Sequence, residues 1–553
     1  MSNEKTTGQG AVPTTRPPQK TFLGQTKGEW YIYWICAVAS IANIELPRFQ
    51  GFDSGIYSII ISDQRFIDYF HVDGARSGVV ASMVNLGNVL GNLCVAWWFI
   101  WFLGRRYAFA LGTLVLLVGV ALQAGATRFS MIVVGRIISG IGTAIIGTNL
   151  AAYQAEVSSP AIRGRVVSFV QLSYQVGVLI SYCVGLGTVK ISGNNAWRTA
   201  TALQVVPGVI LILASFTIPE SPRWLLERYP NTPERALKEL SKIRKLPEND
   251  ESVQEEYLEL VASYQYRVQH EGEYSWWTFL SKYAMWKRIA YGMATMALGQ
   301  ISGVGALMLY GVLIFKGLGF STETLSLLLN VVSGILCLAA TSITTGGVDK
   351  WGRRITLIVG SSIMVETFLE HHENSKLICG IQVISYIIIG ALADAYPTET
   401  HFNRAAAIVQ VIFIYVIEMA YSGALGPCAW IYASEIFPTQ VRDKGVNISQ
   451  AGQQMTTLWI NQAWPVMFDN VGHDAYWILM AINLVGLAVV LLFWPETKGI
   501  SLEHMDKLFG EVDKVDAFKV ENRVTTVEDI FEKKEGKETQ ANDKAATTHE
   551  ENV

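Results

Sequence analysis

A carboxylate and a guanidinium stand in two segments that are otherwise apolar. Asp53 lies in the sequence GFDSGIYSIII, and Arg136 opens the sequence GRIISGIGTAIIG. A charged side chain inside a bilayer costs about 3 kcal/mol on insertion scales, so these residues need a partner or a function. A carboxyl group binds its proton more tightly when it is buried alone than when it lies beside an arginine. We therefore expect Asp53 and Arg136 to pair, and to bind and release a proton as helices move; the alternative is that Asp53 caps a helix end in water.

Charged motifs in short polar segments occur twice along the chain, in the same order. GRR at 104–106 recurs at 352–354, and a glutamate seven residues before an arginine occurs at 156 and again at 435. An arginine at a helix end can bind carboxylates of neighbouring helices and the negative ends of helix dipoles. We expect gating ion pairs that hold one conformation and break in another; the alternative is that the positive charges only set the topology. The residues concerned are Arg105, Arg106, Glu156, Arg163, Asp349, Arg353, Arg354, Glu435 and Arg442.

The composition is that of a membrane protein. Of the 553 residues, 50% are hydrophobic and only 16% are charged, whereas soluble proteins carry roughly a quarter of charged residues. The apolar residues fall in runs of about twenty, the length that a helix needs to cross a bilayer. These features exclude a soluble enzyme, a disordered chain and a fibrous protein, and they predict an all-α polytopic membrane protein. The net charge of −4, without a broad basic field, excludes nucleic acid as a partner.

The candidate spans form two sets of six. They lie at 30–62, 77–100, 107–125, 129–152, 166–187 and 199–218, and then at 287–315, 324–346, 355–396, 405–434, 446–469 and 474–494. Together with the repeated motifs they predict two pseudo-symmetric six-helix halves, with a substrate site at the bilayer midplane. The predicted organisation is a disordered cytoplasmic tail at 1–28, a first half at 29–218, a cytoplasmic loop with short helices at 219–285, a second half at 286–502 and a cytoplasmic tail at 503–553.

Basic residues in the short loops predict the orientation. The segments 104–107, 163–165, 349–354 and 440–444 are rich in Lys and Arg, and the alternate loops hold few. Because cytoplasmic loops carry the excess of positive charge, we expect both termini in the cytoplasm. Within the central loop, TPER at 232–235 ahead of ALKELSKIRK predicts the start of an amphipathic helix.

The ordered set of loop motifs resembles the sugar porter family of the major facilitator superfamily. The set comprises GRR, E-x(6)-R, PESPR at 219–223 and PETKG at 495–499, and the resemblance covers about residues 30–505. It implies the twelve-helix fold of that superfamily and transport by alternating access. The position three residues before Gly104, usually acidic or an amide in the family, is Trp101, so the first set of ion pairs is expected to lack a partner that the second set keeps in Asp349.

The resemblance also implies a proton site and a substrate site. Asp53 and Arg136 match the pair that couples protons in the family's symporters, and facilitators often have Asn in place of that Asp. Amides both donate to and accept from adjacent sugar hydroxyls, and an indole offers an apolar face to the ring. The alternative for each candidate is a contact between helices. The candidates for the substrate site are Gln171, Gln300, Trp430, Tyr310, Gln453 and Gln454.

Several positions depart from the family pattern in the second half. Gly299, Gly305 and Leu309 stand where the family has Gln, Asn and Tyr, whereas Gln453 and Gln454 stand where many relatives have Asn-Trp. Amides are thus lost from one helix and gained on another. This argues against ordinary glucose specificity and favours a larger or less polar ligand.

The predicted ninth span is interrupted by the polar sequence ETFLEHHENSK. Neither apolar fragment beside it is long enough for a core of about 30 Å at 1.5 Å per residue. Removing 365–382 joins Met364 to Val383 and leaves one apolar span of 24 residues. We interpret 365–382 as a retained intron or gene-model error; the alternative is a genuine re-entrant insertion. A smaller boundary error is a second hypothesis for the polar residues Glu45 to Arg48.

The sequence therefore predicts a secondary active transporter that imports a sugar or polyol with proton symport. The alternatives are a facilitative uniporter and a nutrient sensor that does not transport. We expect no enzymatic activity, no cofactor and no metal site, because no nucleophile–base set or metal-ligand spacing stands out. The expected partners are the sugar or polyol, the proton and the lipid bilayer, and we expect a monomeric multi-pass protein of the plasma membrane.

Overall fold

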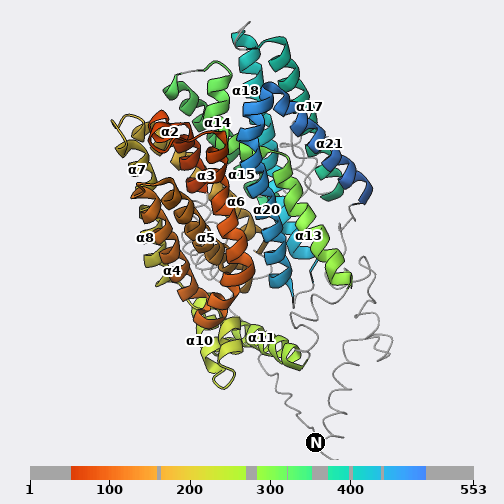
Figure 1. The fold of residues 1–553 in the computed structure, drawn as a ribbon. Coiled ribbons are helices and arrows are strands. Elements are labelled where there is room, and N and C mark those ends of the chain that lie inside the picture. Colours follow the sequence, from red (N-terminus) through yellow and green to blue (C-terminus); the bar gives the residue numbers. More distant parts are fainter. Residues whose placement is uncertain are drawn as a thin grey trace, which may run out of the picture. The chain divides into compact units, whose positions relative to one another are not determined.

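Helices make up the regular structure of the chain (Figure 1). The computed structural model describes residues 51–157, 163–269, 283–320, 322–350, 371–397, 403–437 and 441–493, and these contain helices and no strand. Seven helices in this described part are long and apolar enough to cross a membrane. They are Gly74–Val95, Trp98–Ala124, Phe129–Leu150, Asn195–Ser215, Met285–Gly317, Thr324–Ile343 and Arg404–Gly423. The all-α class follows from these helices, whereas the tails expected at 1–28 and 503–553 and the suspected boundary error at 45–48 lie outside the described residues.

The chain divides by its contacts into two compact units. The first comprises residues 1–56 and 94–269, and the second comprises residues 57–93 and 270–553. The sequence repeat places residues 57–93 in the first half, but by contacts they belong to the second unit. The reason is that α3 (Gly74–Leu90) packs along α20 (Arg442–Val471), where the Ser82 hydroxyl donates to the Gln462 side chain at 2.9 Å.

The first unit is built on two long helices, α4 (Ala96–Ala124) and α5 (Phe129–Val157), which pack along each other. Glycines permit their close approach, because a Cβ at Gly119 or Gly142 would lie 2.5 Å from a backbone nitrogen of the other helix. Gly104 has φ +82° and turns α4 sharply just before Arg105. The remaining elements are α6 (Arg163–Thr188), α7 (Asn195–Ala202), α8 (Val205–Ser215), α9 (Pro222–Arg228), α10 (Glu234–Arg244) and α11 (Glu251–Gln269).

Short helices follow the last span of the first unit. The Ser221 hydroxyl accepts from the backbone N–H of Trp224, and Pro222 begins α9, which is a typical N-terminal cap. Helix α10 begins at Glu234, where the sequence predicts a helix start, and buries one apolar face. Arg244 at its end makes two hydrogen bonds to the Glu256 carboxylate of α11, at 2.7 and 2.5 Å. This pair fixes α10 against α11.

The second unit contains helices that are broken within their apolar length. α13 (Tyr283–Ile301) and α14 (Val304–Gly317) meet at Gly303, which has φ +82°. α18 (Arg404–Ala420) continues through the π-helical turn η3 (Tyr421–Leu425) into α19 (Gly426–Glu435). Besides α3, α20 and α17, the second unit contains α2 (Gln64–Phe70), the π-helical turn η1 (Gly91–Val95), α15 (Glu323–Lys350), η4 (Gly472–Asp474) and α21 (Ala475–Phe493).

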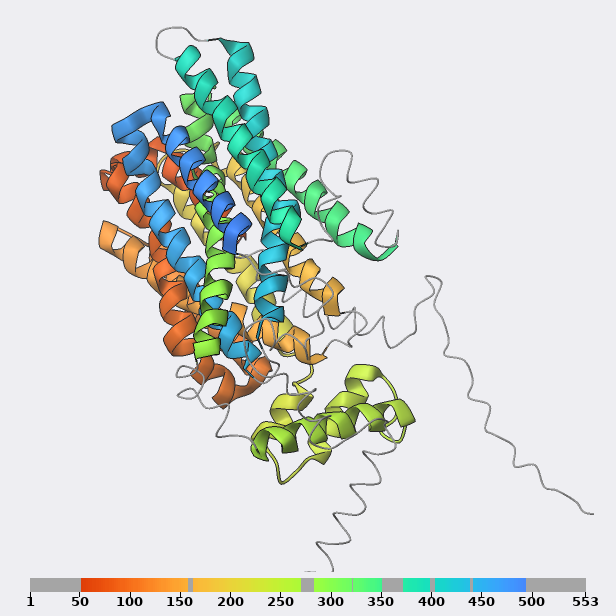
Figure 2. The same ribbon diagram turned by 90° about the vertical axis from the view of Figure 1, so that its right-hand side faces the viewer.

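Helix α17 (His371–Ala395) bears on the interrupted ninth span. It packs against α18 and α21, as Figure 2 shows. Residues 371–382 of the suspected insertion form its first turns, so the helix is longer than the apolar fragment that the sequence identifies. Within α17, only the part Ile381–Ala395 is apolar. Residues 351–370, which precede the helix, lie outside the described part of the chain. Whether 365–382 belongs to the natural protein stays a prediction.

Candidate functional site

Asp53 and Arg136 form a buried ion pair inside the first unit. The Arg136 Nη1 donates to both carboxylate oxygens of Asp53, at 2.9 and 2.7 Å. Asp53 is 6% exposed and Arg136 is 1% exposed, so water screens the pair little. The two residues are 83 positions apart in the sequence, and the structure brings them together as the sequence predicts. In such a pair each charge compensates the other, and removing either partner would leave an uncompensated buried charge.

Two glycines beside Asp53 determine where its helix lies. Residues 51–62 are helical, and a Cβ at Gly51 would lie 2.3 Å from the carbonyl oxygen of Tyr174 on α6. One turn later, a Cβ at Gly55 would lie 1.7 Å from the Ser181 hydroxyl. The backbone of the Asp53 helix therefore touches α6 directly. Small residues four apart on one face are the usual means of close helix contact in membranes.

Gln171 lies on the same helix α6, eight residues after its start at Arg163. The side chain is half-buried. Within the part of the chain that the structure describes, it makes no hydrogen bond to another residue. Its amide is therefore free to donate to and accept from a ligand.

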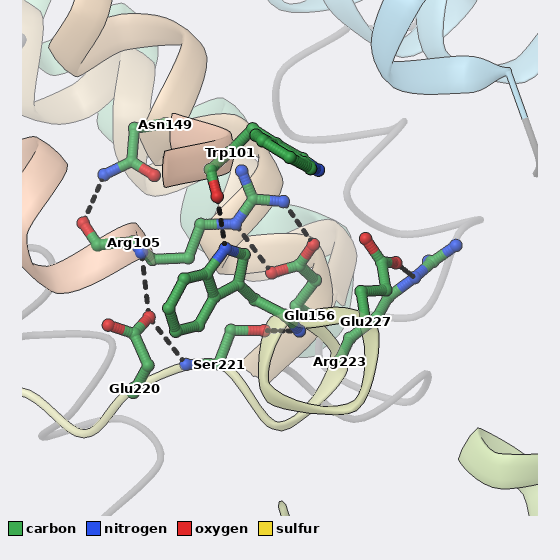
Figure 3. A network of polar contacts seen from close by, with 9 residues as sticks. Trp101, Arg105, Asn149, Glu156, Glu220, Ser221, Arg223 and Glu227 are labelled. Atoms are coloured by element: carbon green, nitrogen blue, oxygen red, sulfur yellow. Dashed lines mark hydrogen bonds and ion pairs between the residues drawn. The ribbon is translucent and has the colours of Figure 1, made fainter. Parts of the chain in front are cut away.

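A polar network joins the Gly104 turn to the segment after α8 (Figure 3). Arg105, directly after the Gly104 turn within α4, makes two hydrogen bonds to the Glu156 carboxylate at the end of α5, at 3.0 and 2.6 Å. The Glu220 carboxylate accepts from the backbone N–H of Arg105 at 2.8 Å and of Arg106 at 3.3 Å. Asn149 completes the network by donating to the Arg105 carbonyl at 2.6 Å. Glu220 thus satisfies two N–H groups that the turn at Gly104 leaves without a helical partner.

Trp101, which replaces the family's acidic or amide residue, takes part through its backbone and its ring. Its carbonyl accepts from the Trp224 indole at 3.3 Å, and the Arg228 guanidinium lies 5.0 Å from its ring centre. Arg106 donates to the Phe216 carbonyl at 2.5 Å. The guanidinium groups of Arg106 and Arg228 are therefore held by a carbonyl and aromatic rings, whereas Arg105 keeps its carboxylate partner Glu156.

The two carboxylates of the network have opposite pKa shifts. Burial opposes ionisation of Glu156, but the Arg105 and Arg223 guanidinium groups outweigh it and hold its pKa below the ordinary value. Burial raises the pKa of the Glu220 carboxyl, although backbone N–H groups of Ser221, Arg105 and Arg106 act in the opposite direction. Glu156 is therefore the fixed charge of this network, and Glu220 is the member that accepts a proton more readily.

In the second unit, Gln300 and Asn461 present oxygens to the same place. The Gln300 Nε2 donates to the Tyr421 hydroxyl at 2.7 Å, which leaves its Oε1 available. Asn461 on α20 is 5% exposed, and its Oδ1 is buried without a partner in the described structure. A Cβ at Gly305 would lie 3.3 Å from Gln300 Oε1 and 4.0 Å from Asn461 Oδ1. The glycine that replaces the family's Asn thus leaves two acceptors facing its backbone, where a ligand hydroxyl can donate.

The other substrate candidates differ in what they contact. Tyr310 is 2% exposed and donates its hydroxyl to the Asn461 carbonyl at 2.9 Å, which joins α14 to α20. Trp430 is half-buried and packs on a cluster that includes Met296. Gln453 and Gln454 lie on α20, and the Gln453 Oε1 is buried without a hydrogen-bond partner in the described residues. The roles of these residues stay predictions.

The gating residues of the second half cannot be compared with those of the first. Arg353 and Arg354 lie outside the described residues, and so do the side chains of Arg163, Asp349, Glu435 and Arg442. The expected pairs of Glu156 with Arg163 and of Glu435 with Arg442 stay predictions. Arg288 on α13, which the sequence analysis missed, is fully buried and donates to the Ile436 carbonyl at 2.9 Å.

The sequence did not predict the roles of three further polar residues. Asn461 lies seven residues after Gln454 and therefore on the same face of α20, so helical spacing could have found it. Glu418 is a second carboxylate in an apolar span, and the rule that singles out Asp53 applies to it equally. The role of Glu220 depends on a contact 115 residues away, for which the sequence holds no local signal. Among the described residues, no three His, Cys, Asp or Glu side chains gather to hold a metal.

Comparison with known proteins identifies the family. The family profile described as Sugar (and other) transporter matches residues 36–509. Sugar transport protein MST7 of Oryza sativa subsp. japonica is 30% identical over 74% of this chain and 75% of its own length. MFS-type transporter criB of Aspergillus cristatus is 28% identical, with 83% and 90% covered, and the quinate permease of Neurospora africana is 27% identical, with 90% and 92% covered.

The fold is also that of solved transporters. The proton:xylose symporter XylE bound to 6-bromo-6-deoxy-D-glucose superposes with a TM-score of 0.66 and 23% identity, over 87% of this chain and 100% of that one. The inward open xylose transporter XylE from E. coli gives a TM-score of 0.65 at 22% identity, over 86% and 99%. The likeness shows the fold, and the relatives are transporters and not enzymes. The chain is therefore a multi-pass membrane protein that belongs to the sugar transporter family of the major facilitator superfamily.

Proposed function

We propose that this transporter imports a sugar or polyol together with a proton by alternating access. The buried pair of Asp53 and Arg136 is the observation that carries the proposal. A carboxylate in a span that exchanges its arginine partner for a proton gives the transporter two states of different charge. The named symport activity of XylE, which has the same fold, supports this proposal. A uniporter would have no need of a titrating group in this position.

The decisive experiment replaces Asp53 by Asn, which keeps the size and hydrogen bonding of the side chain but removes its charge. In vesicles with an imposed proton gradient, we expect loss of uphill accumulation and of its pH dependence. Exchange of labelled substrate between equal pools is expected to survive, because exchange releases no net proton. Concentrative uptake at the wild-type level would contradict the coupling role.

A matched control is available ten residues further along the chain. Asp63 caps α2 by accepting from the backbone N–H of Arg65 at 2.9 Å. Asparagine caps helices as well as aspartate does. Asp63→Asn removes the same charge and is therefore expected to leave concentrative uptake unchanged.

We propose a substrate with several hydroxyl groups, for which Gln300 and Trp430 are the binding candidates in the second unit and Gln171 is the candidate in the first. The acceptors near Gly305 support this, since Gln300 Oε1 and Asn461 Oδ1 can both receive ligand hydroxyls. Relatives named as sugar transport proteins favour a sugar, and a relative named as a quinate permease widens the range. Growth of a transporter-null yeast that expresses this chain, on a panel of hexoses, pentoses, polyols and quinate, identifies the substrate. Absence of growth on every sugar and polyol would contradict the proposed class.

The expected location is the plasma membrane, with a monomeric chain and both termini in the cytoplasm. The basic loops support the orientation, because cytoplasmic loops carry the excess of Lys and Arg. Epitope tags at the two termini test it. Both tags are expected to bind antibody only after the cells are permeabilised.

A further inference from the structure

A second carboxylate is buried in an apolar span and takes no part in the function described so far. Glu418 lies near the end of α18, within the apolar helix Arg404–Gly423, and is 3% exposed. Its Oε2 accepts a hydrogen bond from the Ser333 hydroxyl on α15. Asp53 has an arginine partner, but no Lys, Arg or His of the described residues pairs with Glu418. An unpaired carboxylate in such a place is costly, and the neutral acid is the form that is buried at least cost.

The groups around Glu418 are hydroxyls and a thiol. On α15, Ser333 donates to it and Cys337 lies one turn further along, and Tyr386 of α17 lies within range of its charge. Tyr415 precedes it on its own helix. The other titratable groups on packed elements have partners elsewhere: Tyr310 and Lys316 of α14 donate to the carbonyls of Asn461 and Ser62, and Tyr421 of η3 accepts from Gln300. None of these groups supplies a positive charge to the Glu418 carboxyl.

The hydroxyls near Glu418 are themselves engaged in bonds between helices. Tyr386 donates to the Ser302 carbonyl at 2.8 Å, and Tyr415 donates to the Leu329 carbonyl at 2.8 Å. Their protons are therefore directed to those carbonyls. The Glu418 carboxyl has only the Ser333 hydroxyl as a hydrogen-bond partner among the described residues. Among these groups, Glu418 is therefore the one whose protonation state can change without breaking a hydrogen bond to a backbone carbonyl.

We propose that Glu418 is a second proton-binding group, in the second unit, which is neutral in this conformation. It releases its proton to water when α15 and α18 move apart and water reaches the carboxyl. The step transfers one proton from the carboxylic acid to water and leaves the carboxylate, so charge balances without any further reactant. The proposal rests on the proposed transport function only for its effect on uptake.

The position of Glu418 connects it to the proposed substrate site. Three residues after it, in the π-helical turn η3, the Tyr421 hydroxyl accepts from Gln300 at 2.7 Å. A π-turn within an α-helix is a local irregularity that often occurs at functional sites. Movement of this short segment changes both the surroundings of Glu418 and the bond to Gln300. Substrate binding and protonation of Glu418 are therefore coupled, each favouring the same helix position.

Infrared spectroscopy on the full-length protein in lipid nanodiscs tests the proposal with the proton as the probe. The C=O stretch of a protonated carboxylic acid is separate from that of a carboxylate. At neutral pH we expect an acid band that Glu418→Gln removes and that Asp53→Asn leaves in place. The band should disappear as the pH is raised. Ser333→Ala keeps the carboxyl but removes its hydrogen bond, and should shift the band.

Two results would overturn the proposal. Identical acid bands in the wild-type and Glu418→Gln proteins at every pH would mean that Glu418 is ionised throughout. An acid band that belongs to Glu418 but stays constant over the whole pH range in which the protein remains folded would mean a permanent link between helices. The infrared measurement needs no transport, so a negative result leaves the Asp53 proposal intact. Normal Asp53-dependent coupling in a protein that lacks the Glu418 acid band would contradict only the proposal for Glu418.

Discussion

At the scale of single residues, Arg105 and Glu156 form the more buried of the two ion pairs described near the Gly104 turn. The two side chains are 11% and 6% exposed. Removing one member of a buried pair leaves the other charge without compensation, at a cost of about 3–5 kcal/mol. The neighbouring pair of Arg223 and Glu227 is about one-third exposed on each side, and such pairs contribute less than about 1 kcal/mol.

These magnitudes give a prediction for stability and its pH dependence. Glu156→Gln should lower the unfolding free energy by about 3–5 kcal/mol at neutral pH, whereas the control Glu227→Gln should change it little. The folded state holds the pKa of Glu156 below its ordinary 4.5, so the stabilisation is complete above that value and is lost as the pH falls below it. Thermal unfolding of the detergent-solubilised protein at pH 7 and pH 4 measures this. Equal sensitivity to acid in wild type and Glu156→Gln would contradict it.

The amides of the proposed substrate site give a second prediction at this scale. Gln171→Ala and Gln300→Ala should each weaken substrate binding by about 1–3 kcal/mol, because a buried hydroxyl is left unpaired. Surface abundance should stay normal. Gln254→Ala on α11, whose amide donates to the Glu248 carbonyl, is the control. Competition assays with labelled substrate measure the effect, and unchanged affinity in both variants would mean that these residues only pack.

At the scale of elements, the contact between the Asp53 helix and α6 depends on the absence of a side chain. Gly51→Ala would place its Cβ 2.3 Å from the Tyr174 carbonyl oxygen, so the two helices must separate. We expect a loss of folded protein at the cell surface and weaker proton coupling in what remains. Gly187→Ala on α6 meets no atom within 4 Å and is the matched control. It should be tolerated, since alanine favours a helix by about 0.5–1 kcal/mol over glycine.

The sequence predicts elements better than it predicts their contacts. The apolar runs identify the described helices, and the rule on charges in membranes leads to the pairing of Asp53 with Arg136. Gln300 was predicted as a substrate residue, but the approach of Asn461 to Gly305 was not, because it depends on where α14 meets α20 in space. The contact of the PESPR glutamate with the Gly104 turn was also not predicted, because the sequence identifies that glutamate only as part of a motif. Length and hydropathy carry no information about such tertiary contacts.

At the scale of the whole molecule, the hypothesis about residues 365–382 concerns whether the functional transporter contains this segment. The apolar part of α17, Ile381–Ala395, spans about 22 Å at 1.5 Å per residue, which is short of a core of about 30 Å. Deleting 365–382 should therefore raise surface expression and uptake. Deleting the last 18 residues, 536–553, removes the same length from the tail and is the control. Equal uptake with and without 365–382, or a spliced message that contains those codons, would contradict the hypothesis.

The bonds from Glu220 to the backbone of Arg105 and Arg106 have a consequence for biosynthesis. Gly104 ends one stretch of α4, so the helix that restarts at Arg105 begins with N–H groups that need acceptors. Their acceptor is encoded 115 residues later, after three further stretches of apolar helix. On the ribosome the chain emerges from its N-terminus, so the start of this helix remains uncapped until the segment after α8 has been made. The second part of α4 is therefore capped only after residues up to Glu220 have been synthesised and have packed against the Gly104 turn.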